Sequence, residues 1–140
     1  MGKNQTRSEA RAEAFKLVFQ AEVNGDDLEF LISEMLENNP GSEQNIDYIR
    51  AVVFGVSKKS DELKADICEH LSGGWKIERI SKVSLALLKL AIYEIKYMDD
   101  IPPKVSVNEA VELDKKYDEP DNSAFINGVL GGFMRKNKII

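Results

Sequence analysis

The sequence contains few residues that form disulfides or bind metals. Of its 140 residues, one is cysteine and one is histidine. Cys68 has no second cysteine to pair with, so an internal disulfide is excluded, which fits a reducing cytoplasm. Cys68 and His70 form a C-x-H pair, but a metal site needs more ligands, and helix positions i and i+2 face different directions. We therefore expect no metal and no cofactor.

Long apolar runs and known catalytic patterns are also missing. No run of about 18 apolar residues exists, so a membrane span is excluded. Residues 1–15 hold no apolar segment of the kind that secretory signals contain, and we expect a cytoplasmic protein. The chain has no phosphate-binding glycine loop, no nucleophile elbow and no zinc-protease pattern. The sequence therefore predicts a protein that is not an enzyme.

Charge is distributed unevenly along the chain. The formal net charge is −5, which argues against a general nucleic-acid binder that lacks a local basic patch. Residues 1–16 carry +2 and residues 133–140 carry +3, so the segment between them carries −10. An acidic body with basic ends favours one local contact with an anionic partner, and the plain alternative is that the charged ends are only solvated.

Apolar residues recur at helical spacing through most of the chain, and no convincing strand pattern appears. Glycine, proline and asparagine clusters separate the helical segments. One long segment covers residues 44–71 and is expected to bend near Gly55 or Ser60. Residues 82–98 are apolar on nearly every side, which is typical of a central helix. We predict an all-α protein of about seven helices in two small bundles, residues 1–74 and 75–140.

Local patterns predict how the last two helices begin. Ser106 and Glu109 have the spacing of a capping box, with Val105 and Ala110 placed to form a hydrophobic staple. The final helix is expected over residues 122–136, capped by Asp121, Asn122 or Ser123. Its Gly128 is unfavourable inside a helix, and we expect a close approach to a neighbouring element there. The acidic residues between 109 and 121 lack calcium-loop spacing, so we expect most of them to face solvent.

The two ends of the chain supply the candidate RNA contacts. Lys3, Arg7 and Arg11 are spaced by four, so a helix places them along one ridge that suits phosphate groups; ordinary solvated charge is the alternative. The start of the last helix favours a nearby phosphate through its backbone amides. Phe125 lies in its first turn, where an exposed ring would stack on an unpaired base. A position in the core is the competing interpretation for Phe125.

The C-terminal half carries a specific pattern of motifs. An apolar helix with Lys89, Ala91, Tyr93 and Glu94 is followed by "IPPKVSVNEAVEL" at 101–113 and, after a short polar loop, by "FINGVL" at 125–130. These motifs closely resemble those of the bacterial transcription antitermination factor NusB family. "RSEARAEAFKLVFQAE" at 7–22 and "YIRAVVFGV" at 48–56 also fit, so the resemblance covers nearly the whole chain.

The resemblance implies a two-bundle helical protein that binds RNA and catalyses nothing. Members pair with the ribosomal protein NusE and grip the single-stranded boxA element of nascent RNA. With RNA polymerase and other Nus factors they oppose termination, notably in ribosomal RNA operons. The RNA-binding residues are then expected among Lys3, Arg7, Arg11, Asp121, Asn122, Ser123 and Phe125, and the partner-binding residues among Phe19, Ser84, Lys89 and Glu94. A core position is an equal alternative for Phe19.

The chain departs from the family pattern in several places. Its first helix holds fewer arginines than is usual, and Ala124 replaces the common basic residue before Phe125. Ser84 stands where an acidic residue is usual, and Asp114 stands where alanine is usual. These departures keep three alternatives open. One is a protein–protein adaptor with only a minor RNA contact, a second is a homodimer that masks its own RNA face, and a third is an RNA-binding appendage separated from an RNA methyltransferase.

Overall fold

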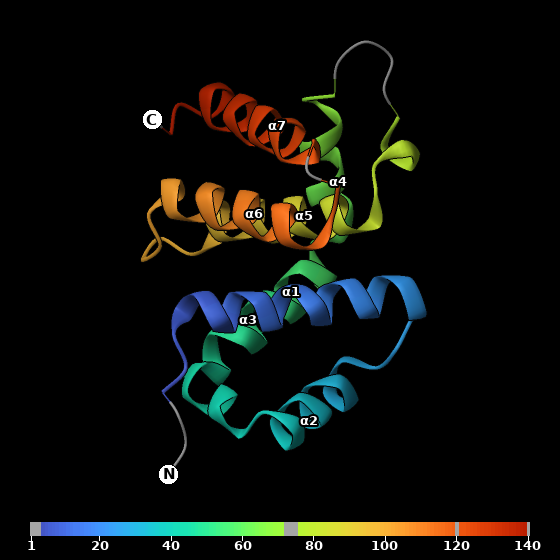
Figure 1. Cartoon of the computed structure of the whole chain (residues 1–140). Helices are drawn as coiled ribbons and strands as arrows, with labels where there is room; N and C mark the ends of the chain where they lie inside the picture. Colours follow the sequence, from blue (N-terminus) through green and yellow to red (C-terminus); the bar gives the residue numbers. More distant parts are fainter. Residues whose placement is uncertain (1–3, 72–75, 120, 140) are drawn as a thin grey trace. The chain divides into compact units, whose positions relative to one another are not determined.

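The computed structural model describes residues 4–71, 76–119 and 121–139 (Figure 1). Within these residues it contains seven α-helices and two short 3₁₀ helices and no strand, which confirms the all-α prediction. The chain divides into two compact units, Met1–Lys58 and Lys59–Ile140. The boundary expected near residue 74 falls outside the described residues. The observed division comes earlier because the helix that follows Lys59 packs on helices of the second unit.

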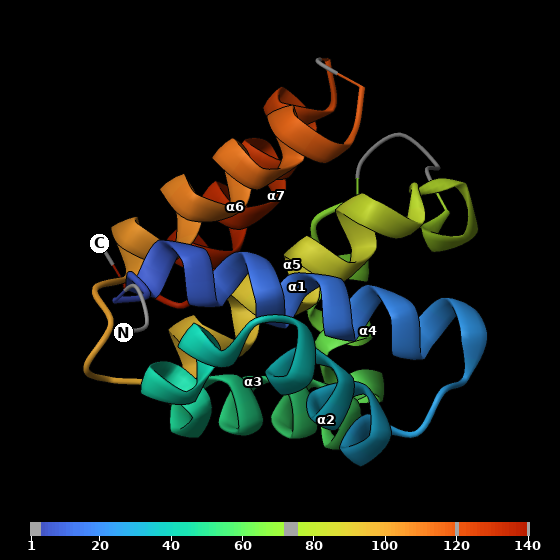
Figure 2. The same cartoon turned by 60° about the horizontal axis from the view of Figure 1, so that its bottom comes forward.

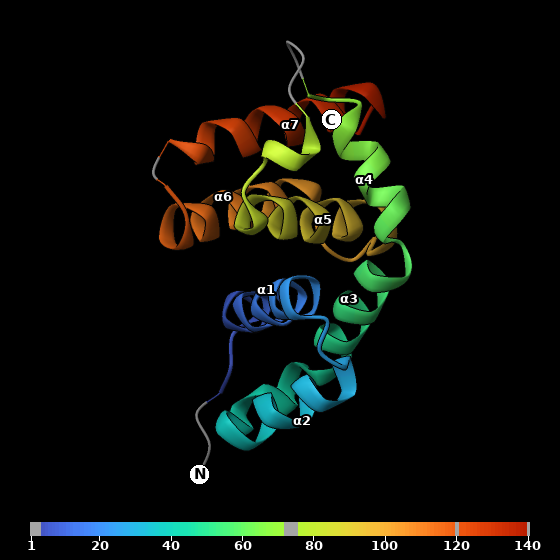
Figure 3. The ribbon, with the colours of Figure 1, turned by 90° about the vertical axis from the view of Figure 1, so that its right-hand side faces the viewer.

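The first unit is built from α1 (Arg7–Asn24), α2 (Leu28–Asn38), η1 (Pro40–Asn45) and α3 (Ile46–Lys58). Helix α1 packs on α3 and α2 and contributes the expected apolar stripe, including Ala10 and Ala14, to the core (Figure 3). Asp27 caps α2 by accepting a 3.0 Å hydrogen bond from the amide of Phe30. Thr6 and Glu9 form a capping box at the start of α1, which the T-x-x-E pattern could have predicted.

The second unit contains α4 (Ser60–Cys68), η2 (Ile77–Arg79), α5 (Lys82–Tyr97), α6 (Pro103–Tyr117) and α7 (Asn122–Lys136). Helix α5 contacts α4, α6 and α7 and is buried over most of its length, as its apolar sequence predicts. Figure 2 shows α6 and α7 side by side, and Figure 3 shows α4 beside the ends of α5 and α7. The long segment predicted over 44–71 is two helices that break at Lys59, next to the expected bend at Ser60.

The interface between α5 and α6 contains a hydrogen bond near each end. Ser106 donates to Glu94 at 2.7 Å, and Ser84 donates to Asp114 at 3.1 Å, while Ala110 is buried between these two pairs along α6. The predicted capping box of Ser106 is therefore wrong. Helix α6 begins three residues earlier, at Pro103, because a proline in the first turn has its φ already set for a helix. Val105, the expected staple residue, is exposed.

Helix α7 begins at Asn122, as predicted, but Asp121 makes no side-chain capping hydrogen bond. The close approach expected at Gly128 is also absent, because within the described ranges no atom beyond the neighbouring residues and the backbone of α7 itself lies within 4 Å of a β-carbon there. Gly132 has the close neighbour instead. A β-carbon at Gly132 would lie 3.0 Å from Nδ1 of His70, so the missing side chain allows α7 to pass close to the end of α4.

The described residues contain neither a membrane-spanning helix nor a cluster of metal-binding side chains. No helix among them is long and apolar enough to cross a membrane. Within the same ranges, no group of three or more histidine, cysteine or acidic residues is arranged to hold a metal ion. Cys68 is an exposed free thiol.

Candidate nucleic-acid interface

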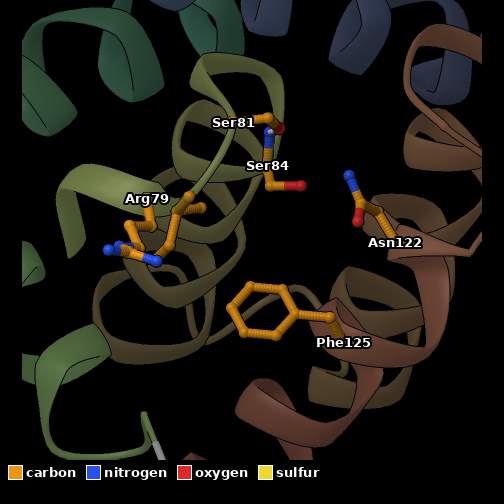
Figure 4. A pocket seen from close by; sticks show the side chains of 6 residues that line it. Arg79, Ser81, Ser84, Asn122 and Phe125 are labelled. Carbon is orange, nitrogen blue, oxygen red and sulfur yellow. Dashed lines mark hydrogen bonds between the residues drawn. The ribbon is translucent and has the colours of Figure 1, made fainter. Parts of the chain in front are cut away.

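The ring of Phe125 lines a pocket in the second unit. The pocket has a volume of about 250 Å³ and lies between the start of α7 and the segment that leads from η2 into α5 (Figure 4). Phe125 is half-buried, whereas the next residue, Ile126, is completely buried. The ring is therefore reachable from the pocket and is not part of the sealed core. The described residues that line the pocket are Arg79, Ile80, Ser81, Ser84, Asn122 and Phe125.

Polar groups of α5 and α6 form a compact cluster behind one wall of this pocket. Ser81 caps α5 by accepting a 3.0 Å hydrogen bond from the amide of Ser84, and it donates its own proton to Asp118. The hydroxyl of Ser84 lies 3.1 Å from Asp114 and 3.1 Å from Asp118. The acidic segment is thus not uniformly solvated as expected, because Asp114 is completely buried and its Oδ2 has no hydrogen-bond partner among the described residues.

The pKa values of Asp114 and Asp118 are shifted in opposite directions. Burial raises the pKa of Asp114 to about 6, the neighbouring charge of Asp118 adds to this shift, and the hydrogen bond from Ser84 opposes it. Burial works to raise the pKa of Asp118 as well, but the hydrogen bonds that it accepts, first among them the bond from Ser81, lower that pKa overall. Asp118 therefore remains an ionised acceptor near neutral pH, while Asp114 changes charge near pH 6.

The basic ridge expected on α1 is only partly present at the surface. Arg7 is exposed, with its guanidinium 4.4 Å from the ring centroid of Tyr48 and its Nε 3.3 Å from Oδ1 of Asn45. Arg11 is only 2% exposed, and its guanidinium also lies over Tyr48. Four residues rotate the helix by slightly more than one full turn. Position 11 is therefore offset by about 40° from position 7, which places Arg11 on the buried side. Lys3 lies outside the described residues.

The expected partner-binding residues occupy several environments. Phe19 is half-buried on α1, 6.2 Å from the ring of Phe15. Lys89 is 1% exposed and donates to Ser60 at 3.1 Å, and Glu94 is fully buried against Ser106. Ser84 is buried beside the pocket. Lys89 and Glu94 therefore lack the expected surface position, because they lie on buried faces of α5, the central helix of its unit.

Sequence reasoning missed the wall of the pocket that faces Phe125. Arg79, Ile80 and Ser81 were not candidates, although the S-x-x-S spacing of Ser81 and Ser84 ahead of an apolar run was a readable signal for a helix start. No local signal predicted that Arg79 would lie near Phe125, because the two residues come from η2 and α7, distant in the sequence.

The motifs and the all-helical fold agree with one family. A model of the NusB family matches residues 8–135, which is most of the chain. The chain belongs to the NusB family. It is 47% identical over 129 residues to the transcription antitermination protein NusB of Acetivibrio thermocellus, an alignment that covers 92% of this chain and 88% of that protein. It is 42% identical over 132 residues to the NusB protein of Listeria monocytogenes, covering 94% and 98% of the two chains.

Solved structures of NusB proteins have the same fold. The chain is similar to T. maritima NusB with a TM-score of 0.82 and 29% identity, over 96% of this chain and 94% of the other. It is also similar to a chain in the crystal structure of antitermination factors NusB and NusE in complex with double-stranded RNA. That match has a TM-score of 0.78 and 25% identity and covers 93% of this chain and 96% of the other. The NusB fold predicted from the motifs is thereby confirmed.

Proposed function

We propose that this chain is an RNA-binding transcription antitermination factor. Together with the ribosomal protein NusE it binds the boxA element of nascent RNA, notably in ribosomal RNA operons, and makes RNA polymerase resistant to termination. The observation that carries the proposal is membership of the NusB family over residues 8–135. The complex of NusB and NusE with RNA among the similar structures supports the choice of both partners.

Side chains near both ends of the chain contribute to the RNA contact. Phe125 offers a reachable ring at the start of α7, and an unpaired base stacked on such a ring contributes about 1–3 kcal/mol. Arg7 offers an exposed guanidinium at the start of α1 for a phosphate. Asp121 and Ser123, at the start of α7, remain candidates for contacts with the sugar and backbone, and Lys3 for a further phosphate contact.

Phe19 is the strongest candidate for contact with NusE among the four expected residues, because it is neither central in α5 nor fully buried. Lys89 and Glu94 then hold α5 in place through Ser60 and Ser106 and support a partner face indirectly. Ser84 takes part in the pocket instead of offering the acidic contact that is usual in the family.

The test compares neighbouring aromatic and aliphatic residues of α7. An RNA oligomer containing boxA is titrated into the wild type, Phe125→Ala and Ile126→Ala, and each protein is also thermally melted. We expect Phe125→Ala to weaken RNA binding about tenfold or more while changing stability little. Ile126→Ala should lower the free energy of unfolding by about 2–5 kcal/mol while its folded fraction binds RNA normally. A Phe125→Ala protein that loses several kcal/mol yet binds RNA with unchanged affinity contradicts the stacking role.

One observation favours an adaptor as the alternative. The net charge of −5, with few arginines on α1, disfavours strong RNA binding by the chain alone. In that case NusE would supply nearly all of the RNA affinity. A homodimer that masks the RNA face is a variant, and sedimentation of the protein with and without RNA separates it from the adaptor.

A further inference from the structure

Three kinds of chemistry surround the pocket beside Phe125. The ring of Phe125 and the side chain of Ile80 are apolar, and Arg79 brings a guanidinium to the opposite side (Figure 4). Arg79 is exposed, and within the described ranges its guanidinium makes no hydrogen bond and no ion pair. An aromatic face with a nearby cation is the pairing that proteins use for a base and its phosphate.

The polar wall of the pocket presents acceptor atoms. The hydroxyl proton of Ser84 is directed to the carboxylates behind the wall, so the lone pairs of its oxygen remain for a ligand. Asn122 hydrogen-bonds Asp118, and because a carboxylate only accepts, Asn122 donates through its amino group. Its carbonyl oxygen then lies on the side of Phe125, as Figure 4 shows. Ser81 likewise directs its proton to Asp118.

We propose that this pocket takes one unpaired base of single-stranded RNA and favours a base with an exocyclic amino group over uracil. The inference rests on the proposed RNA-binding function and adds base selectivity to it. The base stacks on Phe125, its amino group donates to the oxygens of Ser84 and Asn122, and Arg79 binds the adjoining phosphate. Uracil is disfavoured because its O4 atom would face the oxygens of Ser84 and Asn122. The hydroxyl proton of Ser84 and the hydrogen-bonded amino group of Asn122 are directed to the carboxylates behind the wall.

The test uses two RNA oligomers of equal length, oligocytidylate and oligouridylate. Their backbones carry the same charge and their rings have the same size, but cytosine has an amino group where uracil has a carbonyl oxygen. Each labelled oligomer is titrated into the wild type at fixed salt, with and without NusE. We expect the wild type to bind oligocytidylate about fivefold more tightly, the effect of one net hydrogen bond of about 1 kcal/mol.

Two variants separate base recognition from phosphate binding. Asn122→Ala should reduce the preference for cytosine to less than about twofold, because it removes one acceptor. Arg79→Ala should weaken both oligomers by the same factor and flatten the dependence of log K on log salt by about 0.7, the slope of one single-strand phosphate contact. Arg50→Ala is the charge-matched control, because its guanidinium is paired with Glu29 in the first unit and should leave the affinities for both oligomers unchanged.

The outcomes distinguish this inference from the proposed function. Equal affinity of the wild type for the two oligomers, or a preference for oligouridylate, overturns the selectivity of the pocket. If a boxA oligomer still binds in a manner that depends on Phe125, the RNA-binding function stands and only the selectivity fails. If the wild type binds neither the homopolymers nor the boxA oligomer, with NusE present, both fail. A cytosine preference that Asn122→Ala leaves intact also overturns the assignment.

Discussion

At the scale of single residues, the contact between Ser84 and Asp114 joins two residues that the sequence analysis sets apart from the family pattern. The hydroxyl oxygen of Ser84 and Oδ1 of Asp114 are 3.1 Å apart across the interface of α5 and α6. Asp114, which the sequence alone could not explain, is the hydrogen-bond acceptor for Ser84.

The raised pKa of Asp114 makes the stability of the chain depend on pH. The ordinary value is 3.8 and the folded value is about 6. Between these values the unfolded chain loses a proton that the folded chain keeps, so stability falls as pH rises from about 4 to about 6. The Asp114→Asn variant has no titrating group at this position. As the pH rises over the same range, the variant should therefore become more stable relative to the wild type. Urea unfolding at several pH values measures this, and parallel pH profiles for the two proteins would refute the burial effect.

Arg7 and Arg11 form a matched pair on one helix, one exposed and one buried. Arg7→Ala should cost at most about 1 kcal/mol of stability and flatten the salt dependence of RNA binding by up to about 0.7. Arg11→Ala should cost about 1.5–3 kcal/mol because it removes a buried charged group from its contacts. Chemical unfolding and salt titrations give both quantities. An unchanged salt slope in Arg7→Ala would exclude that residue as a phosphate contact.

At the scale of elements, α7 shows how packing changes the effect of a glycine. Gly128 and Gly132 are one turn apart, yet a β-carbon at Gly128 meets nothing within 4 Å, whereas one at Gly132 lies 3.0 Å from His70. The ring of His70 is itself held edge-on against Phe133, so it has little room to move. The same substitution should therefore have opposite effects at the two positions.

We expect Gly128→Ala to stabilise the protein by up to about 1 kcal/mol, the difference in helix propensity. Gly132→Ala should lower the melting temperature, because the new methyl group displaces His70. Thermal melts of the two variants and the wild type test this directly. Two variants with equal melting temperatures would show that His70 moves aside at no cost.

At the scale of the whole molecule, the charge balance predicts dependence on a partner. The chain carries −5, so the phosphate contacts at its basic sites are opposed by the charge of the acidic body. RNA affinity should rise when NusE is added, and Phe19→Ala should weaken the protein complex more than it weakens RNA binding by the chain alone. Titrations of NusE and of RNA, each with a melting curve of the variant, measure the two effects. The reverse order would place Phe19 in the RNA contact or in the core.

The same charge balance sets a limit on what the chain does without NusE. RNA binding by the chain alone should be weak and should depend only modestly on salt, since few cations contact phosphate and the slope scales with the number of such contacts. If affinity in the absence of NusE equals affinity in its presence, the proposed division of labour is refuted.

The spacing of apolar residues and the positions of helix-breaking residues determined most of the architecture. The apolar stripes, the proline and glycine boundaries and the ends of α7 could be read directly, because local propensity and one-sided burial agree there. The motifs determined the family, because NEAVEL and FINGVL place unusual residues at fixed spacing. The start of α6 was misjudged because a capping pattern and a proline start compete locally, and the structure uses the proline.

Only the tertiary structure decided how polar and charged side chains are used. Arg11, Lys89, Glu94 and Asp114 read as surface charges, but each is buried because its helix turns it toward neighbouring elements. The pocket beside Phe125 likewise combines Arg79 and Ser84 with a helix some forty residues further along the chain. Sequence spacing fixes which residues share a helix face, whereas burial and hydrogen-bond partners depend on which other helix that face meets. The fold was therefore readable from the sequence, and the chemistry of the candidate site was not.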